Sequence, residues 1–420
     1  MSYKANITSN LINQILHLVL GFVCSIFIAR VLGPAGQGYV TYIVLIFTLL
    51  GTYGHLGLNN SVMYFYKRKK IPAEHLYYVN STFLTLIFLV IALVVLTLKK
   101  LGLILSDYPV GWVLGGLSLV ISTFYYTNNY SWYIANEQIR RVNRLNISVF
   151  LLKSAAIIVL GILNAGYFYW VTVATTALNA IVLHIGLKKG VKFRWDWSLI
   201  KREYAYGFII FLASAFHYLH LRVDQLYINA MLGNAQLGIY TLSVTLSELM
   251  FMVPTSITTA LIARLYNTED EQAGSVTMAK TFKLTLYVCI ALALVAVPAS
   301  FAIPFVYGKD FTAAIYSTLI LMPGVVFASL ARVATPYFFT TGKPQVHLKL
   351  TSITLALNCI LNYPLIRLWG INGAAVASSI SYFVFGCAYT MMLVREENFK
   401  LRDLVCLRAS DLRDLLKRNA

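Results

Sequence analysis

Charged residues are scarce in this chain: Asp, Glu, Lys and Arg make up 12% of its 420 residues, against 59% for apolar residues. A soluble protein carries roughly 25% charged residues, so about half of the usual charge is missing. The apolar residues form long runs, and each reaches the roughly 20 residues that an α-helix needs to cross a membrane. We therefore predict an all-α membrane protein.

The sequence also lacks the patterns of disulfides, metal sites and catalytic centres. Its five cysteines have no paired spacing and lie within or beside apolar runs, where free Cys packs as a small apolar residue. No paired carboxylates, nucleophile motif, phosphate-binding glycine loop or metal-ligand spacing is present. We therefore expect no enzyme activity, no metal and no cofactor, apart from H⁺ or Na⁺ as a candidate coupling ion.

Apolar windows between charged breaks predict about twelve membrane-spanning helices in two six-helix lobes. The spans are residues 7–28, 39–66, 76–98, 110–135, 146–163, 167–187, 204–231, 236–262, 281–303, 312–340, 346–368 and 374–394. The corresponding domains are an N-lobe (1–187), a cytoplasmic linker (188–203), a C-lobe (204–395) and a cytoplasmic amphipathic tail (396–420). Repeated spans of this kind exclude a lone signal peptide.

Lys and Arg are distributed unevenly between the two sides of these spans. With both termini in the cytoplasm, 26 of the 34 Lys and Arg lie in or next to cytoplasmic segments, five lie outside and three lie within spans. Such an asymmetry indicates orientation, because cytoplasmic loops are enriched in cations. We therefore interpret the basic residues that give the net charge of +18 as topology anchors that face membrane lipid, and we expect no nucleic-acid partner. All outward loops are short, which disfavours a membrane glycosyltransferase.

Two segments 200 residues apart resemble each other. Leu32–Gly38 and Leu232–Gly238 share Leu, Gly, Ala and the final Gly, and each lies at the first outward turn of a six-helix half. Two halves of six helices have the same orientation in the membrane, and parallel repeats of this kind form two-lobed transporters. His17 and His217 have the same 200-residue spacing, and we expect both to face the space between the lobes.

Two carboxylates in the predicted spans are candidates for binding a coupling ion. Glu248 is surrounded by apolar residues, and the alternative to coupling is a buried ion pair with Arg222, Lys153 or Arg332. Asp224 shares a helical face with His220, and this pair forms a second candidate proton or ion site. The alternative for that pair is an intrahelical hydrogen bond.

Cationic and amide side chains in or near the spans are candidates for substrate binding. Arginine forks suit phosphate oxygens, so a pyrophosphate group would be held by cations. The candidates are Arg30, Lys153, Arg222 and Arg332. Arg30 could instead anchor the outer interface, and Lys153 could extend to the cytoplasmic side. Asn128 and Asn129 are intramembrane amides, which either contact sugar or bridge helices.

Two motifs resemble the polysaccharide transporter family. Ala29–Gly38 resembles the family's opening motif, and Asn358–Ser381 resembles its last two helices, although Arg367–Trp369 varies the usual pattern. The family includes the Wzx-type O-antigen flippases and belongs to the MOP superfamily with MATE exporters and lipid II flippases. The resemblance extends over nearly the whole chain in length, helix count and order.

The resemblance implies alternating access by two six-helix lobes in the inner membrane of a bacterium. The implied substrate is an undecaprenyl-pyrophosphate-linked oligosaccharide, moved from the inner to the outer leaflet for O-antigen, lipopolysaccharide or other surface-polysaccharide biosynthesis. Polymerase and assembly proteins are the implied partners. A MATE-like exporter of small cations is the alternative, but it would require an acidic cavity.

Overall fold

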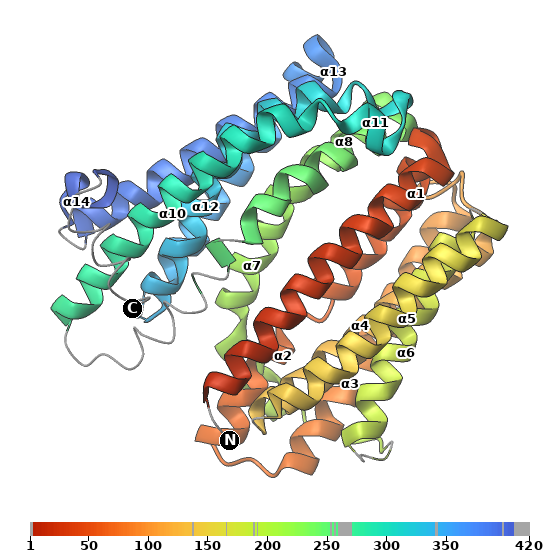
Figure 1. Cartoon of the computed structure of the whole chain (residues 1–420). Coiled ribbons are helices and arrows are strands. Elements are labelled where there is room, and N and C mark those ends of the chain that lie inside the picture. Colours follow the sequence, from red (N-terminus) through yellow and green to blue (C-terminus); the bar gives the residue numbers. More distant parts are fainter. Residues whose placement is uncertain are drawn as a thin grey trace. The chain divides into compact units, whose positions relative to one another are not determined.

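The computed structural model describes residues 3–136, 138–164, 166–187, 190, 192–252, 254–255, 258, 271–340, 343–396 and 399–406. Nearly all of them are helical (Figure 1). They form two compact units, residues 1–212 and residues 213–420. The boundary between the units lies within α7 (Trp197–Leu232).

Unit 1 is built from six α-helices, a π-helix and the first half of α7. The elements are α1 (Tyr3–Tyr53), α2 (Leu58–Met63), the π-helix η1 (Tyr64–Arg68), α3 (Ala73–Lys100), α4 (Val110–Ala135), α5 (Ile139–Leu163) and α6 (Tyr167–Leu187). Helix α4 contacts α1, α3 and α6, and α5 contacts α1 and α6. Phe47, Phe124 and Tyr169 are fully buried in the core between these helices.

Unit 2 contains the second half of α7 and the remaining helices. These are α8 (Asn234–Glu248), the 3₁₀ turn η2 (Leu249–Phe251), α10 (Glu271–Ser300), α11 (Ile303–Tyr307), η3 (Lys309–Phe311), α12 (Ala314–Thr340), α13 (Pro344–Glu396) and α14 (Leu401–Val405). Helices α10, α12 and α13 run side by side (Figure 1). Helix α12 contacts both α10 and α13, and it also contacts α8 and η2. Gly386 allows α12 and α13 to approach closely, because a Cβ there would lie 2.3 Å from the Phe327 carbonyl oxygen.

The surface confirms a multi-pass membrane protein. Among the described residues, eight helices are long and apolar enough to cross a membrane, and the two halves of α7 together make a ninth candidate. Large apolar side chains of α3 such as Leu89, Val90 and Leu93 are 55%, 62% and 68% exposed, which suits contact with lipid. The count of twelve spans and the cytoplasmic location of the termini remain predictions.

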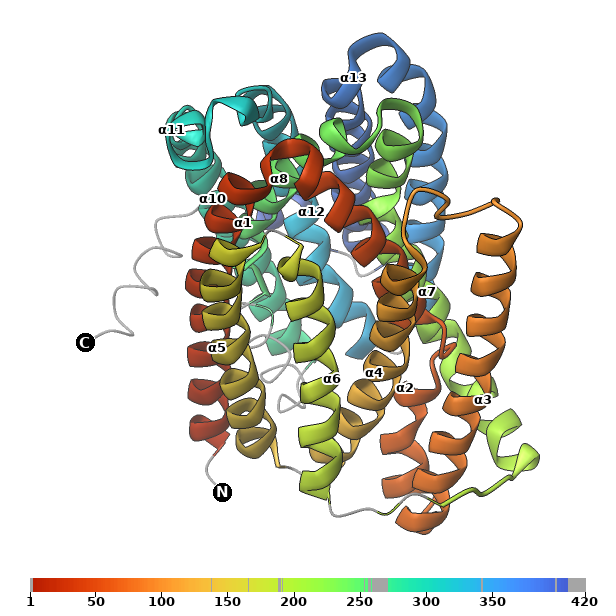
Figure 2. The same cartoon turned by 90° about the vertical axis from the view of Figure 1, so that its right-hand side faces the viewer.

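Two of the long helices each cover two predicted spans. Helix α1 contains a break at Gly33, and α13 contains one at Trp369 and Gly370. The chain reverses direction at the Gly33 break (Figure 2). Both breaks lie where the sequence predicts an outward turn, between spans 1 and 2 and between spans 11 and 12.

The backbone supports the predicted repeat. Gly33 has φ 63° and ψ 179°, and Gly233, at the break between α7 and α8, has φ 81° and ψ −178°. This combination of positive φ and extended ψ is essentially restricted to glycine. The same unusual turn therefore follows the first helix of the predicted N-lobe and the first helix of the predicted C-lobe.

Two predicted boundaries differ from the structure. The span 39–66 is interrupted between Tyr53 and Leu58, where Leu56 and Gly57 have positive φ, and it continues as α2 and a π-helix. The predicted linker 188–203 ends in helix, because α7 begins at Trp197. Of the predicted tail 396–420, residues 401–405 form the short α14, and residues 407–420 lie outside the described residues.

Candidate functional site

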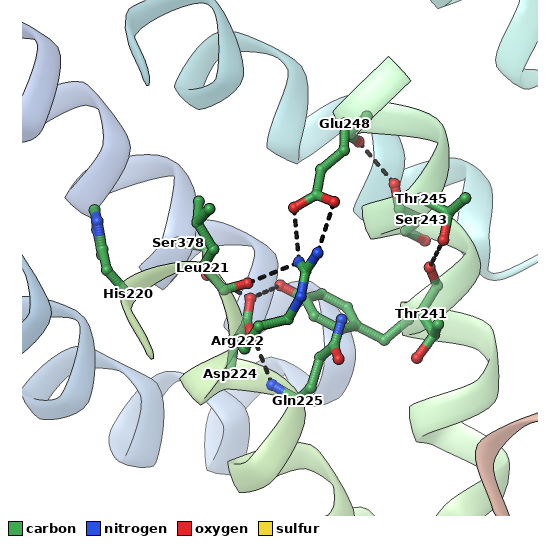
Figure 3. A network of polar contacts seen from close by, with 12 residues as sticks. His220, Leu221, Arg222, Asp224, Gln225, Thr241, Ser243, Thr245, Glu248 and Ser378 are labelled. Carbon is green, nitrogen blue, oxygen red and sulfur yellow. Dashed lines mark hydrogen bonds and ion pairs between the residues drawn. The ribbon is translucent and has the colours of Figure 1, made fainter. Parts of the chain in front are cut away.

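Asp224 is the centre of a polar network that joins three helices of unit 2. Its side chain on α7 is 1% exposed and accepts hydrogen bonds from the Tyr240 hydroxyl (2.6 Å) and the Ser378 hydroxyl (2.8 Å). The backbone N–H of Gln225 donates a third bond at 2.8 Å. Tyr240 comes from α8 and Ser378 from α13, so the carboxylate buried on α7 accepts its hydrogen bonds from neutral donors of three helices. Figure 3 shows Asp224 with Gln225 and Ser378.

His220 lies one helical turn before Asp224 and makes its contacts with α13. Its Nε2 lies 3.0 Å from the Ser381 hydroxyl, and its carbonyl oxygen accepts a 3.0 Å bond from Asn358 Nδ2. The alternative for this pair is an intrahelical hydrogen bond between His220 and Asp224. Among the described residues, the two side chains instead bond to residues of α8 and α13. The structure places these two predicted residues in one region but not in direct contact.

Arg222 and Glu248 form a two-pronged ion pair. Arg222 Nη1 donates to Glu248 Oε1 at 2.6 Å and Nη2 donates to Oε2 at 2.8 Å. The two side chains are 21% and 25% exposed. Glu248 was expected in the middle of a helix, but it is the last residue of α8, before η2. Of the alternatives for Glu248, this geometry is the ion pair with Arg222 (Figure 3).

Arg332 on α12 is a half-buried cation whose guanidinium lies over the ring of Phe251, 4.0 Å from its centroid. Its buried Nε has no hydrogen-bond partner. The ion pairs of the described residues are His75–Asp196 and Arg222–Glu248, so Arg332 has no carboxylate partner among them. His217, also in unit 2, has a ring 5.5 Å from that of His347, and its Nδ1 is buried without a partner.

The predicted residues of unit 1 are distributed over three helices. Asn129 on α4 accepts a 2.9 Å bond from the Tyr77 hydroxyl of α3, and Asn128 Nδ2 donates to Ser81 Oγ at 3.4 Å. Both amides are fully buried, so in this structure they bridge helices. Lys153 on α5 is half-buried and has no ion pair among the described residues.

Two further predicted residues lie on α1. Arg30 is exposed and lies three residues before the Gly33 break. His17 lies in the same helix, but its side chain is outside the described residues.

Sequence reasoning missed a buried carboxylate in unit 1. Glu203 is fully buried, and its Oε1 accepts hydrogen bonds from Ser61 Oγ (2.7 Å) and Asn80 Nδ2 (3.2 Å). Glu203 falls in the predicted linker 188–203. A signal was present, because Leu199, Ile200, Glu203 and Gly207 have the spacing of one helical face.

Sequence reasoning also missed a cavity of about 310 Å³ in unit 1. Its wall combines aromatic, hydroxyl and basic side chains of α3, α4, α6 and the segment before α7. The lining includes Tyr77, Ser81, Thr85, Tyr125, His184 and Lys192. Among the described residues, no group of three His, Cys, Asp or Glu side chains converges as a metal site.

The fold, with its long apolar helices, and these buried polar networks define a multi-pass, nearly all-helical membrane protein. Residues 27–316 match the model of the family described as polysaccharide biosynthesis protein, and the chain belongs to that family. No curated protein matches the sequence significantly.

Solved structures show the same fold at low sequence identity. The lipid II flippase MurJ in an inward closed conformation has a TM-score of 0.75 and 14% identity, over 98% of this chain and 91% of MurJ. An inward-facing multidrug resistance MATE transporter of the MOP superfamily has a TM-score of 0.68 and 12% identity, over 92% and 95%. A MOP superfamily transporter from Pyrococcus furiosus, described by the reverse polarity of its binding pocket, gives 0.65 and 12%, over 93% and 95%.

Proposed function

We propose that this protein is a flippase for a lipid-linked oligosaccharide in the cytoplasmic membrane of a bacterium. The substrate would be an undecaprenyl-pyrophosphate carrier with an O-antigen or other surface-polysaccharide repeat unit. The family's description, polysaccharide biosynthesis protein, supports a role in supplying such material. The MurJ-like fold supports movement of a lipid-linked molecule between leaflets, since MurJ is a lipid II flippase.

The observation that carries this proposal is Arg332, a cation that has no carboxylate partner among the described residues. A cation within an apolar helix is costly unless an anion or a water-filled space accompanies it. Glu248 neutralises Arg222, whereas Arg332 retains its charge over the Phe251 ring. A pyrophosphate would supply the missing anion, and a guanidinium fork binds phosphate oxygens with two parallel hydrogen bonds. Lys153 and Arg30 are the cations that we propose for the same role in unit 1.

No covalent chemistry is needed for this activity. The membrane potential alone contributes roughly 2.3 kcal/mol per elementary charge per 100 mV, and an inside-negative potential favours outward movement of an anion. Coupling to H⁺ or Na⁺ would add a second driving force. We propose Asp224 for that role, since it is a buried carboxylate with neutral donors and no direct cation among the described residues.

A MATE-like exporter of small cations is the second candidate, and the fold similarity to MATE transporters favours it. An exporter of this kind needs carboxylates that are free to meet a cation. Glu248 is occupied by Arg222, which leaves Asp224 as the buried acid of unit 2 for that purpose. The polarity of the described interior of unit 2 therefore favours an anionic substrate.

Deletion of the gene followed by mass spectrometry of lipid extracts tests the proposal. Accumulation of an undecaprenyl-pyrophosphate oligosaccharide supports it, and the mass identifies the repeat unit. Complementation with the natural chain should remove the accumulated lipid, whereas Arg332→Gln should remove less of it. A normal lipid profile together with hypersensitivity to cationic dyes would overturn the proposal in favour of the exporter. Co-purification with polymerase and assembly proteins would test the proposed partners.

A further inference from the structure

The first half of α7 packs on α2 and α3 through one face that contains a single acidic residue. Leu199 and Ile200 are fully buried among side chains of these helices, one turn before Glu203. One turn after it, Gly207 lies against Gly57, and a Cβ at Gly207 would be 3.1 Å from the Gly57 carbonyl oxygen. Glu203 is therefore the one carboxyl group in a tightly packed helix contact whose other described side chains are apolar or neutral.

The carboxyl group of Glu203 is surrounded by neutral groups. Its hydrogen-bond partners are the Ser61 hydroxyl and the Asn80 amide, and its second oxygen, Oε2, is buried without a partner. The Oδ1 atom of Asn80 is also buried without a partner. A buried carboxylate that has no cation is strongly disfavoured and is usually neutralised by binding a proton.

The nearest charged and titratable groups are engaged elsewhere or too weakly placed to neutralise Glu203. Arg202 and Asp196 act on Glu203 electrostatically, and Tyr204 is its neighbour on α7. His75 on α3 and His55 before α2 are further titratable groups of the packed elements. Arg202 donates to the Ser198 carbonyl oxygen at 3.3 Å in an exposed position, and His75 bonds to Asp196. Tyr204 donates to the His55 carbonyl oxygen at 3.4 Å. None of these groups forms an ion pair with Glu203 among the described residues.

The Ser61 hydroxyl shows where a proton would fit. Ser61 Oγ lies 2.7 Å from the Leu58 carbonyl oxygen and 2.7 Å from Glu203 Oε1. One hydroxyl proton can serve only one of these two acceptors. A proton on Glu203 Oε1 would complete the chain, because Glu203 would donate to Ser61 Oγ and Ser61 would donate to Leu58.

We infer that Glu203 is a proton-binding site and that its protonation anchors the first half of α7 to α2 and α3. The neutral acid is compatible with the apolar contact around Leu199 and Ile200, whereas the carboxylate requires water or a cation. Loss of the proton therefore loosens the contact of residues 197–209 with the rest of unit 1. Na⁺ fits less well, because Glu203 Oε1 already faces two hydrogen-bond donors and an oxygen-rich cage is absent among the described neighbours.

Infrared spectroscopy of the purified full chain in lipid nanodiscs, without substrate, tests the inference. Protonated carboxyl groups have a C=O stretch separate from that of carboxylates. The wild-type chain should show a protonated-acid band at neutral pH that disappears in alkaline buffer. Glu203→Gln should lose the part of this band that Glu203 contributes and keep the part from other buried acids such as Asp224. Glu74→Gln, at an exposed site on α3, should match the wild type. Identical spectra for the wild type and Glu203→Gln at every pH would overturn the inference.

Hydrogen–deuterium exchange tests the anchoring step on the same samples. After correction for the intrinsic pH dependence of exchange, residues 197–209 should exchange faster in alkaline buffer in the wild type and in Glu74→Gln. Glu203→Gln, which cannot ionise, should show no such increase, and an equal increase would overturn the anchoring role. Should Glu203→Gln fail to fold, Ser61→Ala replaces it, and an unchanged titration midpoint would exclude Glu203. Because no substrate is involved, failure here leaves the flippase proposal unaffected.

Discussion

Glu203 of unit 1 and Glu248 of unit 2 both place a carboxyl group against apolar helices, but their partners differ. Glu248 meets the Arg222 guanidinium in a two-pronged ion pair and keeps a quarter of its side chain exposed. Glu203 is fully buried and meets only a hydroxyl and an amide. Charge is thus balanced by a countercharge in unit 2 and, as we infer, by a proton in unit 1. How the charge of a glutamate in an apolar segment is balanced therefore depends on the group that it contacts in the folded chain.

Removing one partner of the Arg222–Glu248 ion pair should give the largest loss of stability. Removing one partner of a buried pair costs about 3–5 kcal/mol, and partial exposure lowers our expectation to roughly 2–3 kcal/mol for Arg222→Met. The double variant Arg222→Met with Glu248→Leu should recover most of this loss, because no charge is left unpaired. Unfolding midpoints of the four chains in a double-mutant cycle provide the measurement.

The cycle also separates structure from coupling. Equal losses in the single and double variants would contradict the view of Glu248 as the partner of Arg222. Unchanged export per molecule by Glu248→Gln would exclude a coupling role for this residue.

Arg332→Gln should reduce transport with little loss of stability. The lost charge-assisted hydrogen bonds are worth about 1.5–3 kcal/mol, which corresponds to a roughly 10–140-fold weaker affinity for a pyrophosphate. Arg332→Lys should recover part of this, because it keeps the charge but not the fork. Arg367, which lies over the exposed Tyr363 ring at 4.7 Å, provides the matched control. Binding of a lipid pyrophosphate to the purified chains gives the affinities, and equal affinity for Arg332→Gln and the wild type would contradict the assignment.

The two glycine turns should respond equally to substitution in the two units. A Cβ at Gly33 or Gly233 would meet nothing within 4 Å, so Ala at either position introduces backbone strain without a clash. We expect each substitution to cost about 1–3 kcal/mol of unfolding free energy. Gly21→Ala is the control, because it lies within α1 in equally open space and should be neutral or stabilising. Clearly unequal costs at Gly33 and Gly233 would argue against a shared structural role.

The smallest effect concerns Asp196, a partly exposed carboxylate of unit 1. A hydrogen bond from the Leu199 N–H (2.9 Å) and a bond to His75 (3.0 Å) lower the pKa of Asp196 below its ordinary value of 3.8. A lowered pKa in the folded state means that its contribution to stability is complete above pH 3.8 and is lost as the pH falls through the folded-state value. Asp196→Asn should therefore be slightly less stable than the wild type at neutral pH, with the difference vanishing in acid. Unfolding midpoints measured across this range check it.

Hydropathy predicted some helices to the residue and failed at others for physical reasons. The spans 110–135 and 167–187 coincide with α4 and α6, because polar or proline-containing breaks bound their apolar runs. The span 39–66 was predicted as one helix because the segment between Tyr53 and Leu58 has no charge, although its positive φ angles break the helix. Hydropathy measures transfer to lipid and does not detect backbone dihedral angles.

The site was predictable in its residue types but not in its pairings. Asp224, Glu248, Arg222 and Arg332 were identified from charge within apolar segments, which requires no knowledge of the fold. The bond between Arg222 and Glu248, 26 residues apart, depends on how α7 and α8 turn at Gly233. Glu203 was assigned to the linker because basic residues and tryptophans precede it. Its burial depends on α2 and α3, more than a hundred residues earlier in the chain.

The matched turns at Gly33 and Gly233 have a consequence for how this chain can diverge during evolution. All amino acids except glycine are strained in that backbone conformation. Selection for a stable fold should therefore retain glycine at both positions while neighbouring loops change. A single ancestral six-helix segment with one such turn, duplicated in tandem, is sufficient to account for both. The separation of 200 residues would then record the length of that ancestral segment. Insertions in either half of a related chain can be located by counting from these two glycines.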